Sequence, residues 1–83
     1  MKIHRLRRRL TQVQEEILDA QYGLTMAVNG LANSRDELSS SREYRRIELY
    51  REVIRKLRAQ RNQTLDALDQ SHARDIMLER QAS

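Results

Sequence analysis

Residues 3–34 read IHRLRRRLTQVQEEILDAQYGLTMAVNGLANS, and a seven-residue repeat runs through this stretch without a break. Large aliphatic residues occupy every seventh position, namely Ile3, Leu10, Ile17, Leu24 and Leu31, and Leu38 continues the series. A second series lies between them at the d-type positions, namely Leu6, Val13, Ala20, Ala27 and Ser34. A repeat sustained over about five heptads is typical of a coiled-coil helix, which buries both series against a neighbouring helix. We therefore predict a long helix over residues 2–32.

The second series becomes smaller along the chain, and two glycines lie beside it. Four small residues share this edge of the predicted helix, namely Ala20, Gly23, Ala27 and Gly30. Glycine inside a helix costs about 1 kcal/mol relative to alanine, so two glycines at heptad spacing need an explanation. One explanation is that the backbone of a second helix packs unusually close to this edge. The other is that Gly30 loosens the end of the helix and Gly23 has no particular role.

The second half of the chain carries a less regular apolar stripe. It runs through Ile47, Tyr50, Ile54 and Leu57 and continues through Leu65, Leu68, His72 and Ile76. Arg61 occupies the position between the two groups, and the spacing shifts after it. We interpret this shift as a stutter, which locally relaxes a left-handed supercoil. The pattern predicts a second helix over residues 41–80, whose end near Leu65–Leu78 extends beyond the first helix and offers Leu68, Ile76, Met77 and Leu78 to a partner.

Residues that favour turns and helix caps separate the two stripes. They are Asn29-Gly30, Asn33-Ser34 and Ser39-Ser40-Ser41. Ser40 with Glu43 has the spacing of a capping box, and Ser34 with Glu37 has the same spacing earlier in the chain. We therefore place a connection within residues 33–40 and predict an antiparallel two-helix hairpin. The alternative is one unbroken helical rod, because the sequence contains no proline and Leu38 still follows the first repeat.

The composition limits how such a hairpin is stabilised. The chain of 83 residues forms one domain, 1–83, without cysteine, so neither a disulfide nor a thiolate metal site is available. A core of this size supplies only about 3–5 kcal/mol, and small proteins usually add another source of stability. We expect a partner chain, through self-association into a homodimer or four-helix bundle or through docking on another protein. The sequence lacks a membrane span and the apolar core of a signal peptide, so we expect a cytoplasmic protein.

These patterns predict a non-enzymatic protein–protein interaction module, such as a small coiled-coil adaptor, a co-chaperone or an inhibitor or regulator. The predicted helix–helix or partner interface consists of Leu10, Ile17, Leu24, Leu31, Ile47, Tyr50, Ile54, Leu57, Leu65, Leu68 and Ile76. We predict no catalytic, cofactor-binding or metal-binding residue. His72 has Asp69 and Asp75 one turn to either side, which could recruit a metal, but we favour a solvated histidine with charged neighbours.

The basic residues support a second interpretation, a nucleic-acid-binding regulator. The formal net charge is +4, and all basic residues except Lys2 and Lys56 are arginine, whose planar guanidinium suits phosphate. The candidate contacts are Arg7, Arg8, Arg9, Arg45, Arg46, Arg55 and Arg58. An aromatic stacking platform and zinc-finger ligands, which often accompany such a surface, are missing, because the three tyrosines lie on different faces or on the apolar stripe. Glu43, Glu48 and Glu52 can pair with Arg51, Arg55 and Lys56 at helical spacings, so a self-paired, solvated surface is the preferred interpretation.

Overall fold

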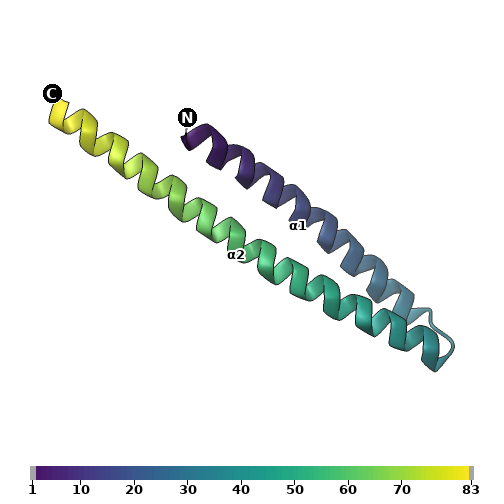
Figure 1. The fold of residues 1–83 in the computed structure, drawn as a ribbon. Coiled ribbons are helices and arrows are strands. Elements are labelled where there is room, and N and C mark those ends of the chain that lie inside the picture. Colours follow the sequence, from purple (N-terminus) through teal and green to yellow (C-terminus); the bar gives the residue numbers. More distant parts are fainter. Residues whose placement is uncertain (1, 83) are drawn as a thin grey trace.

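The computed structural model describes the backbone of residues 2–82 and the burial of residues 3–78. The chain forms two helices, α1 over Lys2–Ala32 and α2 over Glu37–Ala82. They run antiparallel and side by side, and the end of α2 extends past the start of α1 (Figure 1). The predicted two-helix hairpin is therefore confirmed over the unbroken rod. The molecule measures 70 × 14 × 14 Å, so it is only two helices wide.

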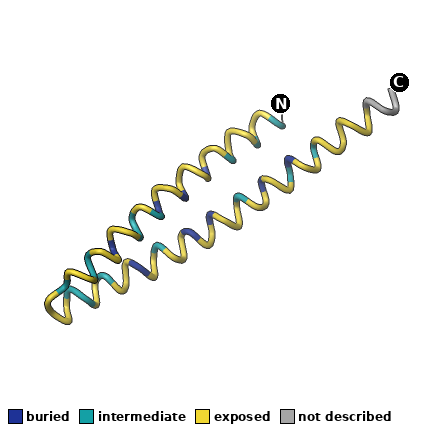
Figure 2. Tube along the Cα trace, turned by 180° about the vertical axis from the view of Figure 1, so that it is seen from behind, coloured by how far each residue is buried: buried dark blue, intermediate teal, exposed yellow. Residues whose placement is uncertain are grey.

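A single layer of side chains between the two helices forms the core. Figure 2 shows the buried positions recurring along the sides on which the helices face each other. Among the described residues, the buried hydrophobic side chains are Val13, Ile17, Ala20 and Ala27 from α1 and Ile47, Ile54, Leu57 and Leu68 from α2. We call this layer the seam. Neither helix contains, within the described residues, a stretch long and apolar enough to cross a membrane.

The connection is shorter than the sequence indicated, because α2 begins at Glu37 rather than near residue 41. The carboxylate of Asp36 caps the helix, since its Oδ1 accepts a hydrogen bond from the Ser39 backbone N–H at 2.6 Å. The predicted capping box of Ser40 and Glu43 is wrong, because both residues lie inside α2. Ser34 does not begin α2 either, and its hydroxyl donates to the Gly30 carbonyl at 2.9 Å, at the end of α1. An aspartate cap adds a favourable charge at the positive end of the helix dipole.

The predicted phase shift after Arg61 is also wrong. Thr64 is buried, with 4% of its surface exposed, whereas 39% of Leu65 is exposed and His72 and Ile76 face solvent. The seam therefore keeps its heptad spacing through Arg61, Thr64 and Leu68. Thr64 is tolerated there because its hydroxyl donates a hydrogen bond to the Gln60 carbonyl at 2.8 Å, which satisfies its polar group within the helix.

Two contacts fix the register of the hairpin. Gly23 lies against Tyr50, and Gly30 lies against Glu43. Moving seven residues toward the end of α1 therefore corresponds to moving seven residues toward the start of α2. Extending this register places the start of α1 level with Ser71, and a depression lined by Ile3, Ser71 and neighbouring residues agrees with it. The overhang is consequently shorter than predicted. Leu65 and Leu68 lie alongside α1, and only the last turns of α2, including Ile76 and Met77, extend beyond it.

The Asp36 cap makes the stability of the hairpin depend on pH. The hydrogen bond from the Ser39 backbone N–H holds the pKa of the Asp36 carboxyl below its usual value. A lowered folded-state pKa means that the carboxylate stabilises the fold fully above the unfolded-state pKa, about 3.9 for aspartate, and that this contribution disappears as the pH falls through the folded-state pKa. We expect the melting temperature of the wild type to exceed that of Asp36→Ala near neutral pH, and the difference to shrink in acid.

Asp36→Asn is the matched control, because its amide oxygen accepts the same hydrogen bond without titrating. Its advantage over Asp36→Ala is expected to persist in acid. The measurement is circular dichroism melting across the acid range. A wild-type advantage over Asp36→Ala that does not change with pH would contradict the charged cap.

The corrected seam predicts opposite results for two nearby leucines. Leu68→Ala removes a buried side chain and is expected to lower the free energy of unfolding by about 2 kcal/mol or more. Leu65→Ala removes a side chain that is already partly in water, so we expect a loss below about 1 kcal/mol. Urea unfolding at one chain concentration measures both values. Equal losses, or a larger loss for Leu65→Ala, would restore the shifted seam.

Candidate interaction surface

The seam contains most of the predicted interface residues, and it brings them together within one chain. Ile17, Ile47, Ile54, Leu57 and Leu68 are buried, and Leu10, Leu24, Leu31 and Tyr50 are half-buried. Val13, Ile17, Ala20, Ile54 and Leu57 form one cluster, against which Leu24 and Tyr50 pack. Leu65 and Ile76 lie outside this layer. Most of the seam is therefore buried between the two helices of one chain, so a surface that contacts a partner has to lie outside the seam.

Gly23 accommodates an aromatic ring. A methyl group at this position would lie 2.5 Å from the Cε1 and Cζ atoms of Tyr50, far inside van der Waals contact. The glycine thus makes room for a side chain, where the sequence suggested room for a neighbouring backbone. The Tyr50 ring lies at the edge of the seam and packs against the buried cluster that contains Ala20.

Gly30 accommodates a carboxylate near the turn. A methyl group there would lie 2.9 Å from Cδ of Glu43. One oxygen of this carboxylate, Oε1, lies 3.6 Å from Nη1 of Arg46, and the other, Oε2, is buried without a hydrogen-bond partner among the described residues. A buried carboxylate oxygen that lacks a partner costs free energy. The seam is consequently less favourable at this end than around Ile54 and Leu57.

The hairpin has two broad faces, one on each side of the seam. In an antiparallel pair, the g-type positions of both helices flank the seam on one side and the e-type positions on the other. We call the first side the glycine face. Near Gly23 it carries Met26 on α1 and Leu49 and Val53 on α2, and all three side chains are exposed.

The other side, which we call the arginine face, differs in charge. Arg51, Arg55 and Arg58 follow one another along α2 at helical spacing, and all three are exposed. Gln14 and Gln21 flank the seam opposite them on α1, and a shallow depression there is lined by Gln14, Ile17, Leu18, Gln21 and Arg61. The acidic residues of α1, namely Glu15, Glu16 and Asp19, lie away from this face at c, f and g positions. The arginine face is therefore basic and polar along the middle of the hairpin.

The structure separates the arginines that were predicted to contact nucleic acid. All seven are exposed; Arg7, Arg55 and Arg58 belong to the arginine face, Arg9 and Arg46 to the glycine face, and Arg8 and Arg45 to the outer sides of the helices. Arg55 forms an ion pair with Glu52, with 2.5 Å between Nη2 and Oε1, and Arg46 lies near Glu43. These seven residues do not form one continuous basic surface.

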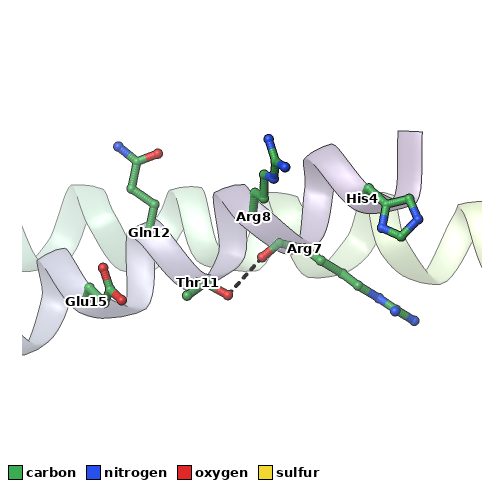
Figure 3. Close-up of a pocket in the computed structure, with 6 residues that line it drawn as sticks. All are labelled: His4, Arg7, Arg8, Thr11, Gln12 and Glu15. Atoms are coloured by element: carbon green, nitrogen blue, oxygen red, sulfur yellow. Dashed lines mark hydrogen bonds between the residues drawn. The ribbon is translucent and has the colours of Figure 1, made fainter. Parts of the chain in front are cut away.

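A shallow depression lies on the surface near the start of α1. It is lined by His4, Arg7, Arg8, Thr11, Gln12 and Glu15, all exposed residues of α1 (Figure 3). Their side chains point in different directions, and the bond drawn is the local one from the Thr11 hydroxyl to the Arg7 carbonyl, 3.0 Å. His72, Asp69 and Asp75 are exposed on α2, and the described residues contain no group of three side chains that could hold a metal ion.

The apolar side chains outside the seam were not assigned to a site from the sequence, apart from those near the end of α2. The exposed large ones on the two helices are Leu18, Tyr22, Met26, Val28, Leu38, Tyr44, Leu49, Val53, Leu65, Ile76, Met77 and Leu78. Some recur four residues apart, as Leu18, Tyr22 and Met26 do. This secondary spacing was present in the sequence but was masked by the stronger heptad repeat. These residues give the hairpin apolar surface on several sides.

The contact between Gly23 and Tyr50 predicts a coupled pair of substitutions. In a Tyr50→Ala background, Gly23→Ala is expected to raise the free energy of unfolding by about 1 kcal/mol, because alanine favours the helix and the ring is gone. With Tyr50 present, the new methyl group displaces the ring, and the gain should be smaller by about 0.5 kcal/mol or more. Urea unfolding of the four variants measures this difference. Equal effects in both backgrounds would contradict the contact.

Comparison of the chain with protein-family models, with curated proteins and with solved structures finds no match in any of the three. The seam and the two faces are therefore interpreted from their own geometry and chemistry.

Proposed function

We propose that this chain is a non-enzymatic protein–protein interaction module, of the adaptor, co-chaperone or inhibitor type. It acts by burying the apolar side chains outside its seam against another polypeptide. The observation that carries the proposal is the surface area of the hairpin. The chain exposes 7159 Å², whereas a compact monomer of 9.9 kDa exposes about 5,200 Å². The excess, about 2,000 Å², is the surface that a thin hairpin leaves in water.

The nature of the exposed side chains supports the same function. Apolar residues scattered singly over a surface are normal, but here large ones recur along both helices. Leu18 and Leu49 are each about two thirds exposed, and burying the rest of each would contribute about 1–2 kcal/mol. A small single-layer core gains most from a partner that covers such residues.

The placement of the arginines favours a protein partner over a nucleic acid. A nucleic-acid-binding surface needs cationic side chains that follow the phosphate backbone together. The seven candidate arginines lie on both broad faces and on the outer sides of both helices, and Arg55 already has a carboxylate partner. The Arg-rich composition fits a solvated helix surface that keeps the chain soluble around its apolar residues.

The proposal is tested by photo-cross-linking in the cells that make the protein. Benzoylphenylalanine replaces Tyr22, Leu49 or Leu65, one at a time, and Ala59, which is exposed on the outer side of α2, serves as the control position. We expect a discrete adduct from at least one apolar position and none from the control. An adduct of twice 9.9 kDa indicates a second copy, and another mass indicates a different protein. No adduct from any apolar position, or equal adducts at Ala59, would contradict the proposed function.

A further inference from the structure

We propose that the partner is a second copy of this chain, and that two hairpins pair through their glycine faces into an antiparallel four-helix bundle. This inference rests on the proposed function and names the surface and the occupant. The two-fold axis runs along the bundle, so that α2 of each copy lies beside α1 of the other at the same level. Every helix then has antiparallel neighbours, as in a regular bundle.

The shapes on the glycine face are complementary under this arrangement. The register of the hairpin places Leu49 level with residue 24 of α1, and Val53 level with residue 20. Both side chains protrude from α2, while the same stretch of α1 presents Gly23 with the Tyr50 ring beside it, the flexible Met26 and the short side chain of Asp19. The two-fold axis places Leu49 and Val53 of each copy against the stretch of α1 around Gly23 in the other copy, so the same contact forms two times. Large side chains packing against small ones give the close interdigitation of a helical core.

The charges beside this apolar patch are complementary as well. The acidic residues Glu16 and Asp19 lie on the glycine-face side of α1. Lys56 lies on the same side of α2, and the register places it level with residue 17. Its side chain is 68% exposed, and its contact with Glu52 in its own chain is long, at 3.9 Å. In the dimer, each Lys56 faces Glu16 and Asp19 of the other copy.

The arginine face cannot serve the same purpose. Two copies meeting there would place Arg51 and Arg58 of one copy beside the e and b positions of α1 in the other. Those positions carry no acidic residue between His4 and Arg35. Burying like charges without counter-charges is unfavourable. Around the middle of the hairpin, charge therefore favours pairing through the glycine face, whose own arginines, Arg9 and Arg46 among them, lie nearer its two ends.

The available area is sufficient for a stable dimer. A standard specific interface removes about 800 Å² from each partner. The surface of the hairpin exceeds that of a compact monomer by about 2,000 Å². Pairing one broad face of a molecule 70 Å long can therefore bury a standard interface and still leave the arginine face exposed.

Two leucines with nearly equal exposure provide the test. Leu49, 64% exposed, lies on the glycine face, and Leu18, 65% exposed, lies toward the arginine face. We expect the wild type to have twice the mass of the chain by light scattering, Leu49→Glu to raise the dimer dissociation constant at least tenfold, and Leu18→Glu to change it less than threefold. Circular dichroism verifies that both variants remain helical. A wild type that stays monomeric at high concentration, or a dimer lost in Leu18→Glu and kept in Leu49→Glu, would overturn the proposal.

A charge exchange tests the alignment of the two copies independently. Lys56→Glu and Asp19→Lys should each weaken the dimer, and the double variant should recover most of the wild-type affinity. Recovery requires contact between copies, because within one hairpin the two residues lie at opposite edges of the glycine face. Failure of the double variant to recover would overturn this alignment. A monomeric wild type that still cross-links to a different protein would remove the self-partner while leaving the proposed function in place.

Discussion

The rest of this structure depends on one geometric constraint, namely that two helices in a hairpin can bury only one stripe of each helix. The seam satisfies that stripe with a single layer of mostly aliphatic side chains around Ile17, Ile54 and Leu57. Everything else on both helices remains in water, because the molecule is only two helices wide. Additional apolar residues on such a chain cannot contribute to its own core, so their burial depends on contact with another chain.

The seam also shapes the surface beside it. At one edge of the seam, Gly23 leaves space for the Tyr50 ring, and Gly30 leaves space for the Glu43 carboxylate nearer the turn. Both glycines lie on the same side, where Met26, Leu49 and Val53 are exposed near Gly23, while the middle of the other side carries arginines and glutamines. A pattern that is required for closing the hairpin therefore makes its two faces unlike. The proposed dimer makes use of this difference between the two faces.

The heptad repeat predicted the hairpin, the length of α1 and most of the seam, because burial repeats every seven residues in both helices. The prediction of the seam was wrong where a polar residue occupies a seam position. Thr64 can be buried because its hydroxyl donates a hydrogen bond to the Gln60 carbonyl. The sequence prediction considered only apolar residues for the seam and therefore assigned this position to Leu65. The start of α2 was misplaced because Asp36 competes with several serines as a cap. Which residues of α1 and α2 lie at the same level on each face depends on the register between the helices, which neither helix reveals alone.

The most direct test of the account is the dependence of thermal unfolding on chain concentration. When folding is coupled to association, mass action raises the melting temperature with concentration. For the proposed dimer we expect a clear rise in melting temperature when the concentration of the purified chain is increased roughly a hundredfold. A cooperative transition at the same temperature throughout this range, from a monomeric chain, would show that the seam alone sustains the fold. That result would contradict the claim that the exposed apolar surface belongs in contact with another copy.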